Sequence, residues 1–353
     1  MSCRKFVWIN LIGIGSLLLL GAVFIFAIDP FFHYHKPWFG LPVVLNNEIY
    51  QTPGAAENFE YDSAIVGSSM TENYRVSWFN EDLGWNTVKL CYEGAETDDL
   101  KAILDKVFEN DRQMQHVLLA IDDYQMISDS SLTAIERPEY LYNDIWLDDV
   151  NYLFNRDALK EAFQRACDGI RGKTFDVDDA YNFSETFEFS KEQVIKDAKP
   201  FRENIMAYPP EKETDEKAYL QVCQDNLDLL LPFVEAHPET EFIVIFSPYS
   251  ILNWEKKVLA GTLKAQLRAD AYVIESFLSY DNVRVFYFQD EYEMITDLEQ
   301  YMDTCHFKEE YNHYIERCIK EGQNEITKED YKERIANMYE IASGYDYGQV
   351  WEE

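Results

Sequence analysis

Three features of this 353-residue sequence predict an α/β fold with a central parallel sheet, joined to a membrane. From residue 61 onward, short apolar runs alternate with amphipathic segments of helical period, the pattern of a parallel sheet covered by helices. Residues 6–28 form an apolar run that contains no charged residue. Between residues 126 and 216 the alternation stops, which predicts a mainly helical insertion.

The apolar run at residues 6–28 is long enough for a transmembrane helix. At about 1.5 Å per residue it spans roughly 34 Å, more than the hydrocarbon core of about 30 Å. Arg4 and Lys5 precede the run and Asp29 follows it. The positive-inside rule therefore predicts a single-pass anchor in the cell membrane, with residues 1–28 as cytoplasmic tip and anchor and the rest outside. A cleaved signal peptide and a buried core helix are the alternatives, but the exit lacks an Ala-x-Ala-like cleavage site.

The charge of the chain excludes one class of partner. With 31 Lys and Arg against 65 Asp and Glu, the net charge is −34, which argues against nucleic-acid binding through phosphate contacts. Such acidity also opposes docking on an anionic surface unless a local patch differs. The hydrophobic fraction of 47% and the aromatic fraction of 15% argue against general disorder.

Residues 29–60 form a juxtamembrane segment whose first part is rich in aromatic residues. His33 and His35 alternate there, which could suggest a metal site, but no thiol is near and Asp29 is the only close carboxylate. We therefore predict an interfacial aromatic belt and no metal. The six cysteines form no Cys-x-x-Cys pair, and the sequence indicates no disulfide framework.

The elements of the α/β part follow from apolar runs and helical periodicity. A short helix is expected at residues 70–75, and the acidic tail from residue 345 is expected to be frayed. We expect strands at residues 63–66, 87–91, 116–121, 241–246 and 283–288. We expect longer helices at residues 97–109, 216–236, 263–280, 308–321 and 327–342.

Gly67, Ser68 and Ser69 directly follow the first predicted strand. A serine at this place, just ahead of a helix, can project from the edge of the sheet. The free N–H groups of a helix start can there receive a developing negative charge. This position suits a nucleophile, although a plain glycine–serine turn would produce the same local pattern.

A second motif lies more than two hundred residues later, where Asp303 precedes His306 by three residues. A serine nucleophile needs a base that takes its proton, and the base needs a carboxylate that holds its tautomer. One short loop ahead of a helix can supply both groups. We interpret Cys305, between them, as a small packing residue.

The early Gly-x-Ser and the late Asp-x-x-His together resemble the first and last motifs of the SGNH (GDSL-like) hydrolase superfamily. Aligned on that pattern, Ser69 is the nucleophile, and Ser68 replaces the aspartate of the superfamily. The resemblance implies that His306 is the general base and that Asp303 orients it.

The chain is also similar to membrane-anchored SGNH-like proteins of Gram-positive bacteria, which are related to cell-surface polysaccharide acyl esterases and O-acyltransferases. It shares with them a Phe-His-Tyr-His-Lys-Pro run at residues 32–37, a Pro-Gly pair at 53–54 and a Ser-Met-Thr-Glu-Asn run at 69–73. The resemblance implies a flavodoxin-like, three-layer α/β/α sandwich over residues 61–353. The insertion at 126–216 follows the end of a strand, so we expect it to form a cap over the site.

The chain departs from the superfamily at the oxyanion hole. The resemblance assigns the N–H groups of Ser69 and Gly94 as donors. The asparagine that normally supplies a third donor is replaced by Asp122 or Asp123. An ionised carboxylate repels an oxyanion and cannot donate to it. We therefore expect a hole built on two backbone N–H groups, or another role for Asp122, such as fixing a loop.

Four further positions support the predicted site, namely Ser68, Asp122, Ser247 and Tyr249. Ser247 and Tyr249 follow the fourth predicted strand and so lie at the same edge of the sheet. They could contact substrate, although the need for a rigid turn explains them equally well.

These features predict an extracytoplasmic serine hydrolase that needs no metal or organic cofactor. The resemblance implies that its substrates are acyl esters on cell-surface or secreted polysaccharide. Two alternatives stay open. One is an O-acyltransferase that receives its acyl group from a separate membrane acyl-donor protein. The other is a non-catalytic polysaccharide-binding or assembly scaffold, which the missing asparagine favours and the intact Ser69, His306 and Asp303 oppose.

Overall fold

The computed structural model describes residues 2–109 and 112–352. The chain divides into two compact units. The first unit comprises residues 1–60 and 136–181, and the second comprises residues 61–135 and 182–353. Residues 136–181 belong to the predicted insertion, and their grouping with the N-terminal segment was not predicted.

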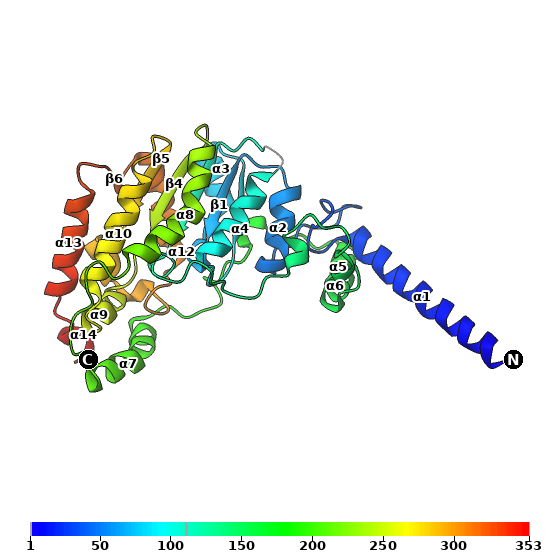
Figure 1. The fold of residues 1–353 in the computed structure, drawn as a ribbon, viewed down its shortest axis with the longest axis horizontal. Coiled ribbons are helices and arrows are strands. Elements are labelled where there is room, and N and C mark those ends of the chain that lie inside the picture. Colours follow the sequence, from blue (N-terminus) through cyan, green and yellow to red (C-terminus); the bar gives the residue numbers. More distant parts are fainter. Residues whose placement is uncertain (1, 110–111, 353) are drawn as a thin grey trace. The chain divides into compact units, whose positions relative to one another are not determined.

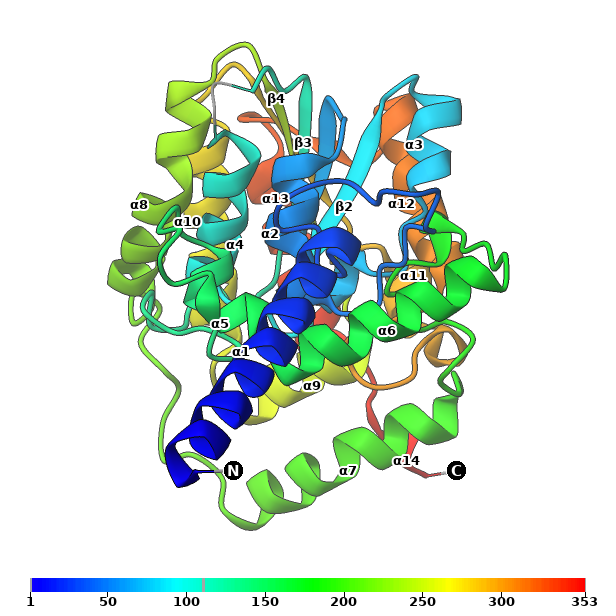
Figure 2. The ribbon, with the colours of Figure 1, turned by 90° about the vertical axis from the view of Figure 1, so that its right-hand side faces the viewer.

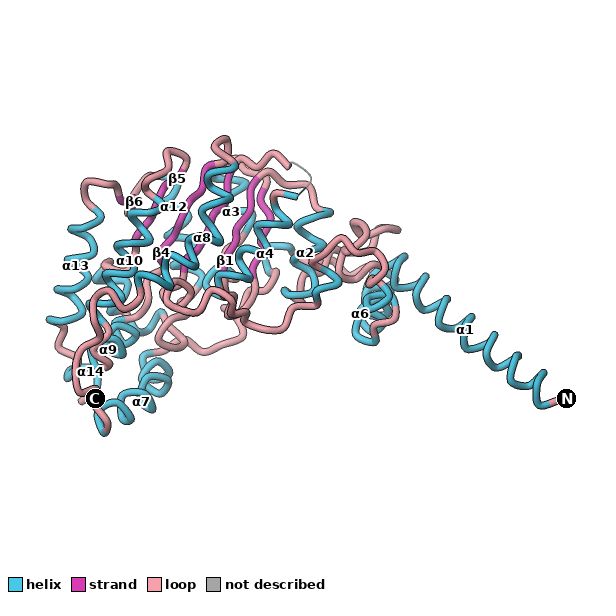
Figure 3. The backbone as a smooth tube through the Cα atoms, viewed as in Figure 1, coloured by secondary structure: helices cyan, strands magenta, loops and turns pink. Residues whose placement is uncertain are grey.

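The second unit contains a six-stranded, mostly parallel sheet, drawn in magenta in Figure 3. The strand order is β2-β1-β3-β4-β5-β6, and only β6 runs antiparallel to its neighbour. The residues of β1 are all buried, as expected for a strand covered on both faces. The prediction of an α/β fold with a largely parallel sheet is confirmed, and β6 is an addition. The strands are β1 (Ser63–Gly67), β2 (Thr87–Cys91), β3 (His116–Ile121), β4 (Glu241–Phe246), β5 (Val283–Tyr287) and β6 (Glu325–Ile326).

Helices connect these strands (Figure 1). Helix α4 packs on α8, α8 packs on α10, and α10 packs on α13, whereas α3 packs on α12. The predicted fraying of the tail is wrong, because α14 forms and buries Val350. The helices of this unit are α3 (Val76–Asp82), α4 (Thr97–Val107), α7 (Lys191–Ala207), α8 (Leu220–Ala236), α9 (Ile251–Leu259), α10 (Leu263–Phe277), α11 (Tyr292–Thr296), α12 (Glu309–Glu321), α13 (Tyr331–Gly344) and α14 (Gly348–Trp351).

The turn after β1 is tighter than predicted. In place of a helix at residues 70–75, the chain forms a single 3₁₀ turn, η1 (Ser69–Thr71). Thr71 Oγ1 donates a 2.7 Å hydrogen bond to the carbonyl oxygen of Ser68. A Cβ atom on Gly67 would lie 2.5 Å from Thr71 Cγ2. Glycine is therefore required where the strand meets the turn that carries Ser69.

In the described residues of the first unit, the helix α1 (Cys3–Ile28) is long and apolar enough to cross a membrane. An apolar helix is predicted here from the sequence, and the structure has one. The unit also contains α2 (Glu48–Asn58), α5 (Val150–Leu153) and α6 (Arg156–Ile170), together with the 3₁₀ turns η3 (Glu139–Leu141) and η4 (Val177–Asp179).

The aromatic first part of the juxtamembrane segment packs closely on α2, which ends the segment. A Cβ atom on Gly54 would lie 2.3 Å from the carbonyl oxygen of Phe31, so only glycine allows this approach. His35 stacks on Trp38 with ring centroids 3.6 Å apart, and His33 Nε2 lies 3.1 Å from Asp149 Oδ1. His35 therefore belongs to an aromatic cluster, and His33 is held by a polar contact to Asp149.

Candidate active site

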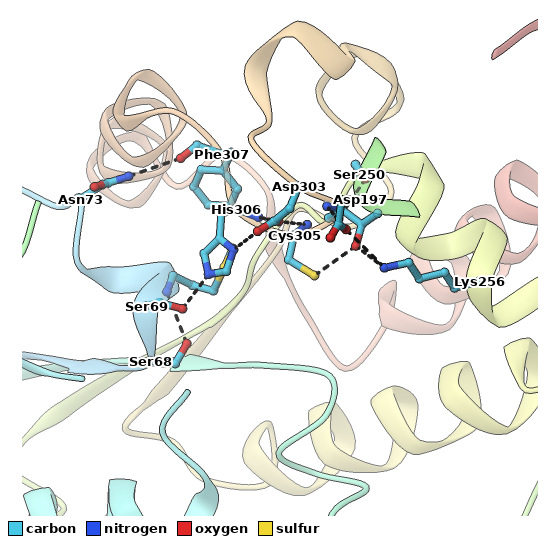
Figure 4. A network of polar contacts seen from close by, with 12 residues as sticks. Ser68, Ser69, Asn73, Asp197, Ser250, Lys256, Asp303, Cys305, His306 and Phe307 are labelled. Atoms are coloured by element: carbon cyan, nitrogen blue, oxygen red, sulfur yellow. Dashed lines mark hydrogen bonds and ion pairs between the residues drawn. The ribbon is translucent and has the colours of Figure 1, made fainter. Parts of the chain in front are cut away.

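Side chains from the two sequence motifs meet at the carboxyl edge of the sheet. Ser69 begins η1 directly after β1, and Asp303 and His306 lie in the loop before α12. Ser69 Oγ lies 2.7 Å from His306 Nε2, and His306 Nδ1 lies 2.6 Å from Asp303 Oδ2 (Figure 4). The structure thus brings together all three predicted catalytic residues, in the connectivity of a Ser–His–Asp triad.

The Asp303 loop is held in place by its own backbone and by a neighbouring turn. Asp303 Oδ1 accepts hydrogen bonds from the N–H groups of Cys305 and His306, at 2.7 and 2.8 Å. This arrangement leaves Oδ2 for the imidazole. The loop is tied to the start of α9, because Ser250 Oγ donates a 2.8 Å hydrogen bond to the carbonyl oxygen of Thr304. The imidazole is therefore held by a preorganised carboxylate.

The charges of the triad support its roles. Burial lowers the pKa of His306, but the hydrogen bond and charge of Asp303 outweigh burial, so the pKa is raised above its ordinary value. The nearby charges of Asp122 and Glu93 raise the same pKa further. Burial alone would raise the pKa of Asp303, yet the bond to His306 lowers it overall. Asp303 is therefore ionised at neutral pH, and His306 directs Nδ1–H toward it and Nε2 toward Ser69.

Asp122 has a structural task at the position of the missing asparagine. It follows β3 and is 1% exposed. Its carboxylate accepts hydrogen bonds from Ser68 Oγ and from Tyr249 Oη, the latter at 2.6 Å. Its own N–H donates to Gln125 Oε1 at 2.8 Å. Burial raises the pKa of Asp122 to about 6. Because both carboxylate oxygens accept bonds from hydroxyls, Asp122 fixes the Ser68 turn and offers no donor to an oxyanion.

Two backbone donors remain for the oxyanion. Gly94 is exposed in the loop after β2, with a φ of +67°, a left-handed conformation that favours glycine. Within the described parts of the chain, neither its N–H nor that of Ser69 donates to another residue. The neighbouring Glu93 is near enough to His306 to raise its pKa. Neither predicted donor is thus engaged by another described residue, and the charge of Glu93, next to Gly94, acts on His306.

The other predicted positions lie below the surface. Ser247 and Tyr249 are each 2% exposed, so neither side chain faces a substrate that arrives from solvent. The hydroxyl of Tyr249 instead donates a hydrogen bond to Asp122. Burial raises the pKa of the Cys305 thiol, which suits the packing role expected of it better than a thiolate nucleophile.

Two residues outside the predicted site, Asn73 and Phe183, help to position it. The side chain of buried Asn73 accepts a 3.0 Å bond from the N–H of Phe183 and donates a 3.3 Å bond to the carbonyl oxygen of Phe307. The ring of Phe183 lies edge-on to His306, with centroids 5.6 Å apart. Asn73 therefore joins the segment that covers the imidazole to the loop that carries it. Asn73 closes the Ser-Met-Thr-Glu-Asn run, whereas nothing in the sequence pointed to Phe183.

One group of side chains in the described residues could hold a metal ion. The ligand atoms of Asp82, His313 and Glu316, on α3 and α12, lie within 4.8 Å of one another. Lys320 Nζ lies 2.6 Å from Asp82 Oδ1, so a lysine already balances this carboxylate. None of these residues belongs to the triad, whose chemistry needs no metal.

No protein-family model matches the chain, and no curated protein matches it. The case for a function therefore rests on the geometry of the site and on the motifs that resemble the SGNH superfamily. The strongest single element is the hydrogen-bonded set of Ser69, His306 and Asp303.

Proposed function

We propose that this protein is a serine-dependent acyl-ester hydrolase of the SGNH type, anchored in the cell membrane with its catalytic unit outside the cell. The observation that carries the proposal is the chain of hydrogen bonds from Ser69 to His306 to Asp303, at 2.7 and 2.6 Å. A half-buried serine bonded to an oriented imidazole is the arrangement that activates a hydroxyl for attack on a carbonyl.

In the proposed mechanism, Ser69 Oγ attacks the acyl carbonyl carbon while His306 Nε2 takes the hydroxyl proton. Asp303 stabilises the imidazolium, and the N–H groups of Ser69 and Gly94 receive the oxyanion. The intermediate then expels the alcohol, which takes the proton from His306, and leaves an acyl group on Ser69. A water molecule, deprotonated by His306, attacks this ester and releases the acid.

The proposal includes a flavodoxin-like, three-layer α/β/α sandwich for the second unit. The order β2-β1-β3-β4-β5 is that of flavodoxin-like sheets, whose ligands bind where the strand order reverses, between β1 and β3. Ser69 follows β1 and Asp122 follows β3, so the site residues flank this switch point.

The proposed location rests on α1 and its flanking charges. The helix has the length and hydropathy of a membrane span, and Arg4 and Lys5 mark its cytoplasmic end. A cleaved signal peptide is the competing interpretation of the same helix. The likeness to membrane-anchored SGNH proteins favours the anchor, and it also suggests polysaccharide esters as substrates.

A transferase is the second candidate, since the same acyl-enzyme can react with a sugar hydroxyl instead of water. In that case a separate membrane protein would supply the acyl group. The buried Ser68–Asp122 pair replaces two hallmark residues of the hydrolases, and this departure supports the transferase as an alternative. A non-catalytic scaffold is less well supported, because a scaffold has no need of an oriented triad.

The proposal is tested by turnover of a small acetyl ester by the purified full chain. We expect Ser69→Ala and His306→Ala each to lower kcat by about 10⁴-fold or more, without change in melting temperature. Ser247→Ala, a buried serine outside the triad, is the matched control and should keep most activity. Activity in Ser69→Ala would refute the assignment. Transfer of acetyl to an added oligosaccharide, faster than hydrolysis, would favour the transferase.

A further inference from the structure

The first unit exposes large apolar side chains beside α1. Their exposed fractions range from 43% at Leu159 to 87% at Ile170. Single exposed apolar residues are ordinary in soluble proteins, but several of them close together in the sequence indicate a surface that binds something. We call this group the apolar strip, which comprises Trp146, Val150, Phe154, Leu159, Phe163 and Ile170.

Helix α6 carries half of the apolar strip and packs on α1 with a different face. Figure 2 shows α6 crossing α1, and Ala158 and Ala162 are buried with Ile25 of α1 in one apolar cluster. The small alanine side chains, one helical turn apart, allow the two helices to approach closely. The face that carries the strip therefore does not serve to hold α6 in the fold.

The exposed surface of α6 is divided lengthwise. Spacings of four and seven residues place the three strip residues of this helix on one side. The polar residues on the adjoining side are Asp157, Lys160, Gln164 and Arg171, all exposed. A helix with an apolar side and a polar, partly basic side suits the boundary between water and lipid.

The end of α1 is locked to the segment that carries the strip. Asp29 ends α1 in a left-handed conformation, and its carboxylate accepts bonds from the N–H groups of Tyr34 and His35, at 2.7 and 2.8 Å. Tyr152 Oη donates a further 2.7 Å bond to the same carboxylate, and Tyr152 lies in α5, just before α6. The position of α6 along α1 is therefore set by buried hydrogen bonds.

That position is the outer end of the apolar helix. The 26 residues of α1 rise about 39 Å, which exceeds a hydrocarbon core of about 30 Å. The buried residues of α1 are Ala22 and Ile25, both in its last two turns. When α1 spans the bilayer, α6 lies at the level where the acyl chains give way to headgroups.

The charge of this segment also differs from that of the chain. Residues 156–173 contain five Lys or Arg and three Asp or Glu, whereas the whole chain contains 31 and 65. Arg165 is buried and pairs with Glu161, and Lys173 pairs with Asp168. The segment is therefore much less acidic than the rest of the chain, so its charge opposes an approach to headgroups less strongly. Trp146, 76% exposed, adds the residue type that is enriched at membrane interfaces.

We propose that α6 and the segment before it lie on the outer leaflet of the membrane, with the apolar strip inserted at the boundary of the acyl chains. This inference rests on the proposed membrane location of α1. The bilayer then contacts the protein at two places, the span itself and a helix in the interface, and the first unit becomes a membrane-bound platform.

The test uses spin labels on the full chain, reconstituted into vesicles of phosphatidylglycerol and phosphatidylethanolamine. Cys3, Cys167 and Cys305, the cysteines that are not buried, are first replaced by serine. Labels are then introduced one at a time through Phe163→Cys and Ile170→Cys in the strip, Gln164→Cys on the polar side, and Leu18→Cys in α1. Collision rates with dissolved oxygen and with a water-soluble nickel chelate report whether each label lies in lipid or in water.

We expect the ratio of oxygen to nickel collisions at positions 163 and 170 to exceed that at 164 by about threefold or more, and to approach that at 18. If the labels at positions 163 and 170 collide with the nickel chelate as often as the label at position 164, while the label at position 18 stays protected, the inference is overturned and the membrane anchor stands. If the label at position 163 is protected from both oxygen and the nickel chelate, the inference is also overturned, because protein and not lipid then covers the apolar strip. Nickel access at 18 would refute the membrane location itself.

Discussion

Ser68 and Ser69 are neighbours in the chain but carry different tasks. The hydroxyl of Ser68 is buried against Asp122, whereas that of Ser69 is half-buried and reaches His306. Ser68→Ala should lower the free energy of unfolding by about 1–3 kcal/mol, because one buried carboxylate oxygen loses its donor. Ser69→Ala should leave stability nearly unchanged. Urea denaturation of both variants checks this, and the opposite ranking would contradict the roles assigned.

Asp122 should make stability depend on pH in an identifiable way. Burial raises its pKa from 3.8 to about 6, so the folded protein favours the protonated form. Its contribution to stability is therefore greatest at low pH and falls as the pH rises from about 4 to about 6. In the Asp122→Asn variant, which cannot ionise at this position, the free energy of unfolding should fall by up to about 3 kcal/mol less over the same pH range. Comparing the unfolding free energies of both proteins across that range is the check. Parallel curves would show that Asp122 ionises normally.

The segments that carry the triad depend on Asn73, which joins the backbones at Phe183 and Phe307. Asn73→Ala should lower kcat/KM by about 10- to 100-fold, because the imidazole and its covering ring lose their common support. Asn226→Ala is a matched control, since that side chain is equally buried and donates to the carbonyl oxygen of Ser128. Steady-state kinetics should separate the two variants. Equal losses of activity would show that Asn73 acts only through stability.

At the scale of elements, those specified by a local sequence pattern were predicted, whereas those that depend on tertiary contacts were not. β2, β3 and β4 have the predicted bounds, because continuous apolar runs specify buried strands. β6, with two residues, has too little sequence to show a period, and α14 depends on burying Val350. The triad was predictable because its two motifs, although 237 residues apart, together resemble the first and last motifs of the SGNH superfamily. The bond from Ser68 to Asp122 joins residues 54 apart, so no local pattern reports it.

At the scale of the whole molecule, the charges around α1 predict one topology. Arg4 and Lys5 precede the helix and Asp29 follows it, so the bulk of the chain should lie outside the cell. A reporter enzyme fused to the C-terminus should be active only on the outer side of the membrane, and the mature protein should retain its first residues. A new N-terminus near Asp29 would show that the helix is a cleaved signal.

The central claim, that Ser69 is a nucleophile activated by His306, is tested most directly by a fluorophosphonate probe. The probe should label the wild type at Ser69, and its rate should rise with pH through the raised pKa of His306, because only the neutral imidazole accepts the proton. The His306→Ala variant should not label, and Asp303→Asn should label far more slowly. Equal labelling of wild type and His306→Ala, or a folded wild type that labels at no pH, would contradict the account.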